Sequence, residues 1–246
     1  MPKTLGILGG LGPAASVYFY RLITEHTAAL CDQDHIDIVL ISSASIPDRS
    51  DFILKKSDRS PLPLMKEGVW KLANAGADLI AIPCNTAHYF FDELSRISPV
   101  PVLNIVRETV QLAKRAGIQR LGILATTGTI VSEAYQHACS GMGMEFRIPC
   151  ESSQQLLMDI IYHSIKTAKA PDLDAFCGIA AELRAGGCDA IVLGCTELSL
   201  LPQDPILESY RFIDSLQVLT YKAIVECGKK PYGFSELYTY IDKALV

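Results

Sequence analysis

The feature of this sequence that most constrains its fold is an internal repeat of strand-like segments. The run GILGGLG, which begins at Gly6, resembles GILATTG at Gly122, and DLIAIPCNT at Asp78 resembles DAIVLGCTE at Asp189. Both pairs occur in the same order and at nearly the same separation, which unrelated strand–helix units do not readily produce. The simplest interpretation is a chain of two similar halves. Each half has a first strand followed by a small-residue loop, and a later strand followed by a cysteine.

Short apolar runs alternate with segments of helical periodicity along the chain. Leu5–Gly9 and Arg120–Ala125 are expected to be strands, whereas Pro13–Cys31 and Ser215–Glu226 are expected to be helices. Strands that are apolar throughout and separated by helices indicate parallel sheets with right-handed crossovers. We therefore expect an α/β protein made of two Rossmann-like halves with parallel sheets. A pseudo-twofold axis would relate the halves, and the active site would lie in the cleft between them.

The repeat also predicts where the halves divide. The N-terminal half is expected to comprise residues 1–104 together with residues 213–246, because the C-terminal segment should return to the first half. The C-terminal half is then residues 105–212. Crossings of the chain near Asn104–Arg107 and Leu201–Arg211 are candidate hinges for closing the cleft.

Composition excludes several classes of partner. Lys and Arg number 22 and Asp and Glu number 27, giving a net charge of −5, whereas nucleic-acid binding needs a basic surface. No stretch approaches the roughly 18 consecutive apolar residues that a membrane helix needs. The first residues show no export signal, so we expect a cytoplasmic protein with neither nucleic acid nor membrane as a partner.

The eight cysteines are expected to be free thiols in such a compartment. There is no C-x-x-C and no Cys/His pair at zinc spacing, so no metal site is expected. Most of these cysteines are interpreted as small buried apolar residues, namely Cys31, Cys139, Cys150, Cys177, Cys188 and Cys227. Cys84 and Cys195 differ because they follow matching strands of the two halves.

The position of these two cysteines suggests acid–base chemistry. Ligands of open α/β sheets bind at the carboxyl ends of the strands, which is where Cys84 and Cys195 are expected to lie. Each precedes residues that can begin a helix, and the positive end of a helix dipole would lower the pKa of a nearby thiol. Two thiols that face one cleft from opposite sides could remove a proton from a carbon and return one to its other face. That reaction inverts a stereocentre.

Four motifs together resemble the cofactor-independent aspartate/glutamate racemases. They are GILGGLGP near the start, PDRS at Pro47–Ser50, PCNTAH at Pro83–His88 and GCTEL at Gly194–Leu198. The resemblance covers almost the whole chain. Glutamate racemases usually carry His where this chain has Glu197, which favours the aspartate racemase branch. Some broader-specificity members carry Thr in place of Cys84, so the chain resembles the two-cysteine type.

The resemblance implies a mechanism, a substrate class and an assembly. Cys84 and Cys195 would be the catalytic thiolate base and thiol acid at Cα, exchanging roles with direction, and no cofactor is expected. The substrate would be a dicarboxylic amino acid, namely aspartate with glutamate as a second candidate, and the protein would be a homodimer. Arg49 in PDRS and Lys166 in HSIKTAK match family positions for carboxylate-binding cations.

Further residues near the cysteines are candidates for substrate binding. Small-residue loops and hydroxyl or amide side chains can supply hydrogen bonds and preorganised donors for carbanionic charge. The remaining candidates are Gly10, Asn85, Thr86, Thr127 and Thr196.

Several alternatives stay open at this level. A maleate isomerase-like enzyme of the same superfamily would use one cysteine covalently, and a non-catalytic small-acid binding protein would need neither thiol. His88 is expected to be structural, and Asp214 is expected to cap a helix. Glu197 either interacts with a helix dipole or orders the Cys195 loop. Ser42–Ser45 departs from the amide-containing segment common in the family, which leaves aspartate and glutamate undecided.

Overall fold

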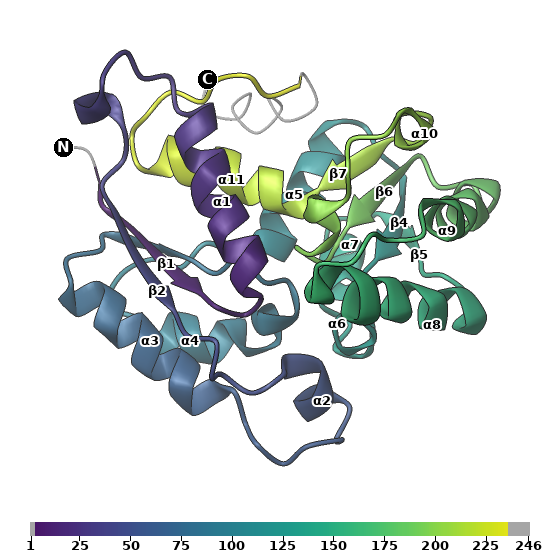
Figure 1. Ribbon diagram of the computed structural model, residues 1–246, viewed down its shortest axis with the longest axis horizontal. Coiled ribbons are helices and arrows are strands. Elements are labelled where there is room, and N and C mark those ends of the chain that lie inside the picture. Colours follow the sequence, from purple (N-terminus) through teal and green to yellow (C-terminus); the bar gives the residue numbers. More distant parts are fainter. Residues whose placement is uncertain (1–2, 236–246) are drawn as a thin grey trace.

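The structure, a computed structural model that describes residues 3–235, contains two separate parallel sheets (Figure 1). The first sheet has the order β2-β1-β3 and the second the order β5-β4-β6-β7. The first-sheet strands are β1 (Leu5–Gly9), β2 (Ile38–Ser42) and β3 (Leu79–Ala81). The second-sheet strands are β4 (Arg120–Leu124), β5 (Glu145–Arg147), β6 (Ala190–Leu193) and β7 (Phe212–Asp214). The predicted α/β class with parallel sheets is confirmed, and the pseudo-twofold axis stays a prediction.

Helices connect the strands. The α-helices are α1 (Pro13–His26), α2 (Arg49–Ile53), α3 (Leu62–Asn74), α4 (Phe91–Ile97), α5 (Ile105–Arg115), α6 (Thr127–Val131), α7 (Ala134–Gly141), α8 (Glu151–Asp159), α9 (Leu173–Ala185), α10 (Pro205–Glu208) and α11 (Ser215–Glu226). Short 3-10 turns are η1 (Asp32–Asp34), η2 (Thr86–Phe90), η4 (Ile165–Thr167) and η5 (Leu198–Leu200), and η3 (Ile160–Ser164) is a π-helical turn. Helix α1 ends at His26, five residues before the predicted Cys31, because Thr27 leaves helical geometry and takes an extended conformation.

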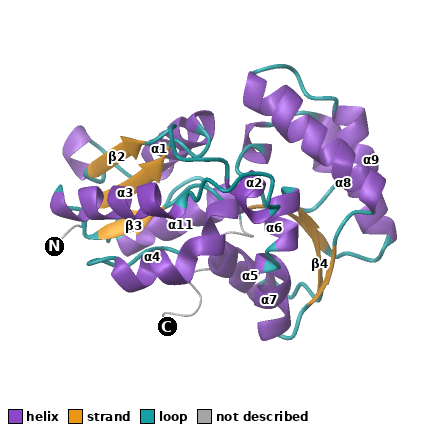
Figure 2. Cartoon of the chain, turned by 90° about the horizontal axis from the view of Figure 1, so that it is seen from below, coloured by secondary structure: helices purple, strands orange, loops and turns teal. Residues whose placement is uncertain are grey.

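The two sheets share a central hydrophobic core. It contains Ile7 of β1 and Ile123 of β4 together with buried residues of α1, α5, α7 and α11. Figure 2 shows α5 and α11 between the strands of the two sheets. Two further cores cover the outer faces: one packs α3 and α4 on the first sheet, and the other packs α8 and α9 on the second. The two halves are therefore joined by apolar packing in this shared core, in addition to meeting at the cleft.

Helix α11 occupies a junction between the halves. Strand β7 pairs with β6 in the second sheet, and Asp214 then caps α11 by accepting hydrogen bonds from the backbone N–H groups of Leu216 and Gln217, as predicted. The helix itself packs against α1 and α5. The division of the chain at residues 104 and 213 stays a proposal.

Gly10 shows why the first loop is rich in glycine. Its φ is +88°, a conformation that L side chains rarely adopt, and a Cβ there would lie 2.5 Å from the backbone nitrogen of Ser43. The bare backbone of this loop thus lies directly against the turn that follows β2. The close approach of this loop is to protein backbone, and the substrate-binding role expected of Gly10 stays a prediction.

We expect Phe19→Ala to destabilise the whole chain, because Phe19 of α1 is fully buried in the central core. Truncation of a buried Phe should lower the free energy of unfolding by about 3–5 kcal/mol, measured by urea denaturation. Thr24→Ala is the matched control, because Thr24 lies on the same helix and is exposed. It should change the free energy of unfolding by only about 0.5 kcal/mol. Equal losses in both variants would contradict this assignment of the core.

Candidate active site

Cys84 and Cys195 line one small cavity between the two halves. Cys84 follows β3 and Cys195 follows β6, and the two side chains are 6% and 4% exposed. The cavity measures about 10 Å³, which is room for about one water molecule. The structure therefore brings the two cysteines together at the carboxyl ends of strands from different sheets.

Hydroxyl groups from both halves close the cavity. Thr86 Oγ1 lies 2.9 Å from both Thr126 Oγ1 and Thr129 Oγ1, and Ser50 donates to Thr126 at 3.3 Å. Thr196 Oγ1 donates to the carbonyl of Pro83 at 3.1 Å. Thr86 and Thr196 thus line the cavity, where their hydroxyls also hold the two halves together, and their role in substrate binding stays a prediction.

Asn85 has a bridging role beside Cys84. Its Nδ2 donates to Ser215 Oγ at 2.9 Å, and its Oδ1 accepts from the Tyr135 hydroxyl at 2.7 Å. Both ends of the amide are therefore engaged, one with Ser215 of α11 and the other with Tyr135 of the C-terminal half, although Asn85 lines the cavity. The side chain orders the loop that carries Cys84.

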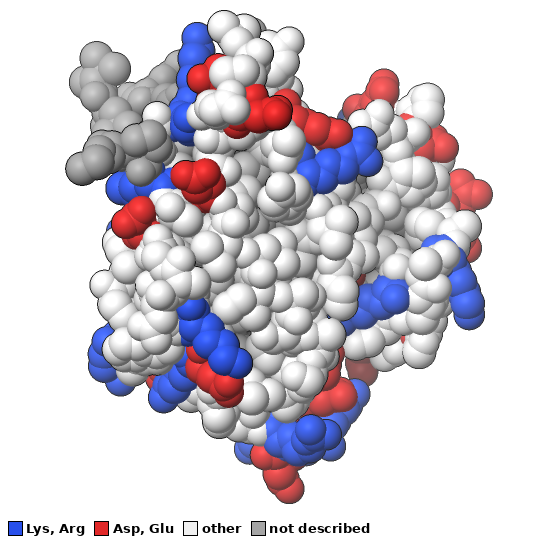
Figure 3. Space-filling model, turned by 60° about the vertical axis from the view of Figure 1, so that its left-hand side comes forward, with Lys and Arg blue, Asp and Glu red and all other residues white. Residues whose placement is uncertain are grey.

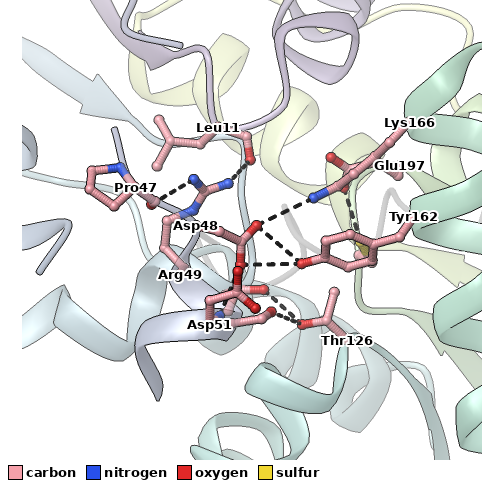
Figure 4. Close-up of polar contacts among 12 residues, drawn as sticks. Leu11, Pro47, Asp48, Arg49, Asp51, Thr126, Tyr162, Lys166 and Glu197 are labelled. Carbon is pink, nitrogen blue, oxygen red and sulfur yellow. Dashed lines mark hydrogen bonds and ion pairs between the residues drawn. The ribbon is translucent and has the colours of Figure 1, made fainter. Parts of the chain in front are cut away.

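Arg49 is buried, and backbone carbonyls hold its guanidinium group. Nη1 donates to Pro47 O at 3.0 Å and Nη2 to Leu11 O at 2.6 Å, as Figure 4 shows. Its Nε is buried and has no hydrogen-bond partner. One N–H group of this anchored guanidinium is therefore without an acceptor, and the group as a whole lies beside the Cys84 thiol and lines the cavity.

Lys166 lies at the mouth of the cavity beside an acidic and an aromatic neighbour (Figure 4). Its Nζ is 3.8 Å from Asp48 Oδ2 and 3.9 Å from the centre of the Tyr162 ring. The Tyr162 hydroxyl donates to Asp48 at 3.2 Å. Because Asp48 belongs to the first half and the other two residues to the second, this group joins the halves across the cleft.

The Asp48 carboxylate is held in its charged form. Burial acts to raise its pKa, but the Asp51 N–H, Lys166 and Arg49 outweigh burial and hold the pKa below its ordinary value. For Lys166, burial acts to lower the pKa. Glu197 and other neighbours outweigh burial, and the pKa lies above its ordinary value. The mouth of the cavity is thus an ion pair at neutral pH.

The pKa values of both thiols are raised, contrary to the lowering expected from helix dipoles. Burial is the main cause for each, and the nearby Glu197 carboxylate adds to it. Arg49 acts against the rise at Cys84, and Lys166 acts against it at Cys195. The turns that follow the cysteines are the short 3-10 segments η2 and η5, whose dipoles are small compared with the cost of removing a thiolate from water. Both thiols are neutral in this closed arrangement.

Glu197 and His88 support the two cysteines. Cys195 Sγ donates to Glu197 Oε2 at 3.0 Å, so the carboxylate does order the Cys195 loop. His88 Nδ1 contacts the Cys84 carbonyl at 2.9 Å, and the Ile105 N–H donates to His88 Nε2 at 3.2 Å. Burial lowers the pKa of His88, so the ring is neutral and structural, as expected.

Two predicted residues lie outside the cavity that holds the thiols. Gly10 lines a larger outer cavity of about 510 Å³, which shares Arg49, Lys166 and Glu197 with the inner one. Thr127 accepts from Gln154 Nε2 at 3.3 Å, and its neighbour Thr126 faces the site instead. The internal repeat led us to this loop, but the predicted residue, Thr127, is one position away from Thr126, which lines the cavity.

Sequence reasoning did not single out Asp48, Tyr162 or Thr126. Asp48 lies within the PDRS motif, which could have drawn attention to it. Tyr162 offered no such signal, because its position depends on the π-helical turn Ile160–Ser164, a local irregularity common at functional sites.

Three cysteines predicted to be buried are not. Cys31 and Cys150 are exposed, and Cys188 is half-buried, because each lies at or beside the end of a secondary-structure element.

Within residues 3–235 no group of three His, Cys, Asp or Glu side chains is arranged to hold a metal ion. None of the helices described is long and apolar enough to span a bilayer. The face in Figure 3 carries basic and acidic side chains around a largely uncharged centre, without a continuous basic surface.

The chain is similar to known proteins in both sequence and fold. A family model described as Asp/Glu/Hydantoin racemase matches residues 8–223. The broad specificity amino-acid racemase RacX of Bacillus subtilis is 28% identical over 227 residues, covering 89% of this chain and 98% of that protein. The structure of aspartate racemase from Picrophilus torridus superposes with a TM-score of 0.82 at 29% identity, covering 98% of this chain and 99% of the other. A glutamate racemase of Aquifex aeolicus is 30% identical over 183 residues, covering 68% of this chain and 65% of that protein.

The raised thiol pKa values predict slow alkylation of the site at neutral pH. The thiolate is the reactive form, so Cys84 and Cys195 should react with iodoacetamide only as the pH rises well above neutrality. Cys150 is exposed, and its hydrogen bonds with Ser152 and Ser153 lower its pKa, so it provides an internal reference. Near pH 7 we expect Cys150 to react at least about tenfold faster, measured by peptide mass spectrometry. Equal rates near pH 7 would show that the site is not sealed.

Proposed function

The chain belongs to the Asp/Glu/Hydantoin racemase family, and on that basis we propose that it is a cofactor-independent amino-acid racemase that interconverts L- and D-aspartate, with glutamate as a further candidate substrate. The observation that carries this proposal is the pairing of Cys84 and Cys195 in one buried cavity, one from each half. A covalent isomerase would need one of these thiols, and a binding protein would need neither.

The proposed reaction is a two-base proton transfer. One cysteine, as thiolate, removes the proton from Cα, and the thiol of the other donates its proton to the opposite face of the carbanion. The enzyme then holds the same number of protons with the roles of the two sulfurs exchanged, so no external acid or redox partner is needed. Because the two thiols interact, they titrate as a pair.

Substrate carboxylates have two cationic partners in this proposal. Arg49, which lines the cavity and has an unpartnered Nε, would bind one carboxylate, and the ammonium group of Lys166 at the mouth would bind the other. Two cations at separate points suit a dicarboxylic amino acid better than a monocarboxylic one. The similarity to a broad specificity racemase is the reason to test other amino acids as well.

The cleft must open for such a substrate to bind. The closed cavity of about 10 Å³ is far smaller than aspartate, and the outer cavity of about 510 Å³ adjoins it. We propose that the Asp48–Lys166–Tyr162 group separates to connect the two cavities, and that closure then excludes water from the carbanion. In the open state the thiols gain solvent, which eases formation of the first thiolate.

We also propose that the protein is a homodimer, on the strength of the family resemblance. Helix α1 exposes Val17 and Tyr20, which are 68% and 48% exposed, and such side chains suit an interface with a second copy.

Deuterium incorporation at Cα in D₂O tests the reaction directly. Without added cofactor, the wild-type protein should exchange the Cα proton of aspartate and invert its configuration, followed by NMR and chiral chromatography. Cys84→Ser and Cys195→Ser should each reduce racemisation by about 100-fold or more, since a positioned acid or base contributes at least that much. Cys139→Ser, at a buried cysteine outside the cavity, is the matched control and should stay active. Loss in only one site variant would indicate a covalent or one-base enzyme, and no exchange of aspartate or glutamate in the wild type would contradict the proposed substrates.

Arg49→Lys should lower kcat/KM for a dicarboxylic amino acid by about tenfold to 100-fold, because a lysine cannot reproduce the anchored N–H geometry. Steady-state kinetics would measure the loss. Arg59→Lys, at an exposed position of the next loop, is the control that should leave kcat/KM unchanged. If Arg49→Lys behaves like this control, Arg49 does not bind substrate.

A further inference from the structure

One buried oxygen of the site is left without a hydrogen bond. Glu197 is 5% exposed; its Oε2 accepts from Cys195 Sγ, while its Oε1 is buried and has no partner. Buried carboxylate oxygens are almost always paired, because leaving one unpaired is costly. An oxygen of this kind is therefore available to accept a hydrogen bond from a bound molecule.

The carboxylate lies where a substrate would meet the thiols. Glu197 lines both the cavity of Cys84 and Cys195 and the larger outer cavity. Gly12 makes room for it, since a Cβ on Gly12 would collide with Oε1. The glycine-rich loop thus admits a carboxylate to the inner site, in addition to packing against the turn after β2.

The other carboxylate of the site is already occupied. Asp48 Oδ1 accepts from the Asp51 N–H at 3.0 Å, and Oδ2 accepts from the Tyr162 hydroxyl at 3.2 Å and faces Lys166 at 3.8 Å. Between the two carboxylates that line the cavity, only Glu197 has an oxygen without a partner among the residues described. An amino-acid substrate brings one cation, its α-ammonium group, which needs an anionic acceptor.

We propose that Glu197 Oε1 binds the α-ammonium group of the substrate and makes the site selective for amino acids over acids that lack the amino group. This inference rests on the proposed racemase function and adds to it the residue that recognises the ammonium group. Arg49 and Lys166 would bind the two carboxylates, so each charged group of the substrate would have one partner of opposite charge.

The same carboxylate also fixes the geometry of the reaction. Its Oε2 holds the Cys195 thiol at 3.0 Å while Oε1 holds the ammonium group, so Cα is placed beside the sulfur. A paired ammonium group stays protonated next to Cα, and its positive charge lowers the free energy of the carbanion. Glu197 therefore serves both recognition and proton transfer.

Binding measurements separate this role from a merely structural one. The background for all variants is Cys84→Ser, which should prevent turnover, and isothermal titration calorimetry measures binding of L-aspartate and of succinate, which lacks the amino group. In the background protein, aspartate should bind more tightly than succinate. Adding Glu197→Gln, which has the same size and no charge, should reduce that preference by about tenfold or more through weaker aspartate binding. Glutamate and glutarate form a second pair with the same expected result.

Control variants decide between the outcomes. Glu67→Gln, an exposed glutamate on α3, should change neither affinity. Gly12→Ala keeps the charge but crowds Oε1, so it should also reduce the preference for aspartate, and it replaces Glu197→Gln if that variant does not fold. Asp48→Asn should change aspartate and succinate binding by the same factor.

An equal effect of Glu197→Gln on both ligands, or no effect, would overturn the ammonium site and leave the racemase proposal intact. If the background protein binds neither amino acid, the proposed substrates are wrong, and the inference that rests on them fails as well.

Discussion

Burial of two thiols between the carboxyl ends of two sheets is the constraint on which this structure depends. Removing a sulfur from water favours its neutral form, and burial is the largest influence on both Cys84 and Cys195. The surrounding hydroxyl contacts and the ion pair at the mouth keep the cavity small. Any chemistry that needs a thiolate must therefore be coupled to opening of the cleft or to the charge of a bound substrate.

Charged groups around the thiols balance one another. Arg49 and Lys166 face Asp48 and Glu197 within one small volume, so the closed site carries no large uncompensated charge. Isolated charges in such surroundings would be costly, whereas paired and hydrogen-bonded charges can be kept. In the proposed function, these internal partners are exchanged for charged groups of the substrate. Asp48 holds Lys166 across the cleft, and a substrate carboxylate could take its place there without leaving a buried lysine unpaired.

The central core limits how the cleft can open. Helices α1, α5, α7 and α11 pack against residues of both sheets, so the halves are not independent bodies joined by a flexible linker. The contacts that can separate are the polar ones near the thiols, such as Asp48 with Tyr162 and Thr196 with Pro83. Hydrogen bonds between polar side chains can be exchanged for water or substrate, whereas separating apolar surfaces costs free energy in proportion to their area. The proposed opening at the mouth therefore breaks polar contacts and leaves the apolar core intact.

Local patterns in the chain were enough to predict the α/β class, the strands that precede Cys84 and Cys195, and the cap at Asp214. These features depend on side-chain periodicity and on hydrogen bonds between near neighbours, both of which involve residues close together in the sequence. Other features depended on tertiary structure: the placement of Thr126 rather than Thr127 at the cavity, the position of Tyr162 and the unpaired oxygen of Glu197. The raised thiol pKa values belong with them. A pKa and a hydrogen-bond vacancy depend on every group within a few ångströms, and those groups come from segments far apart in the sequence.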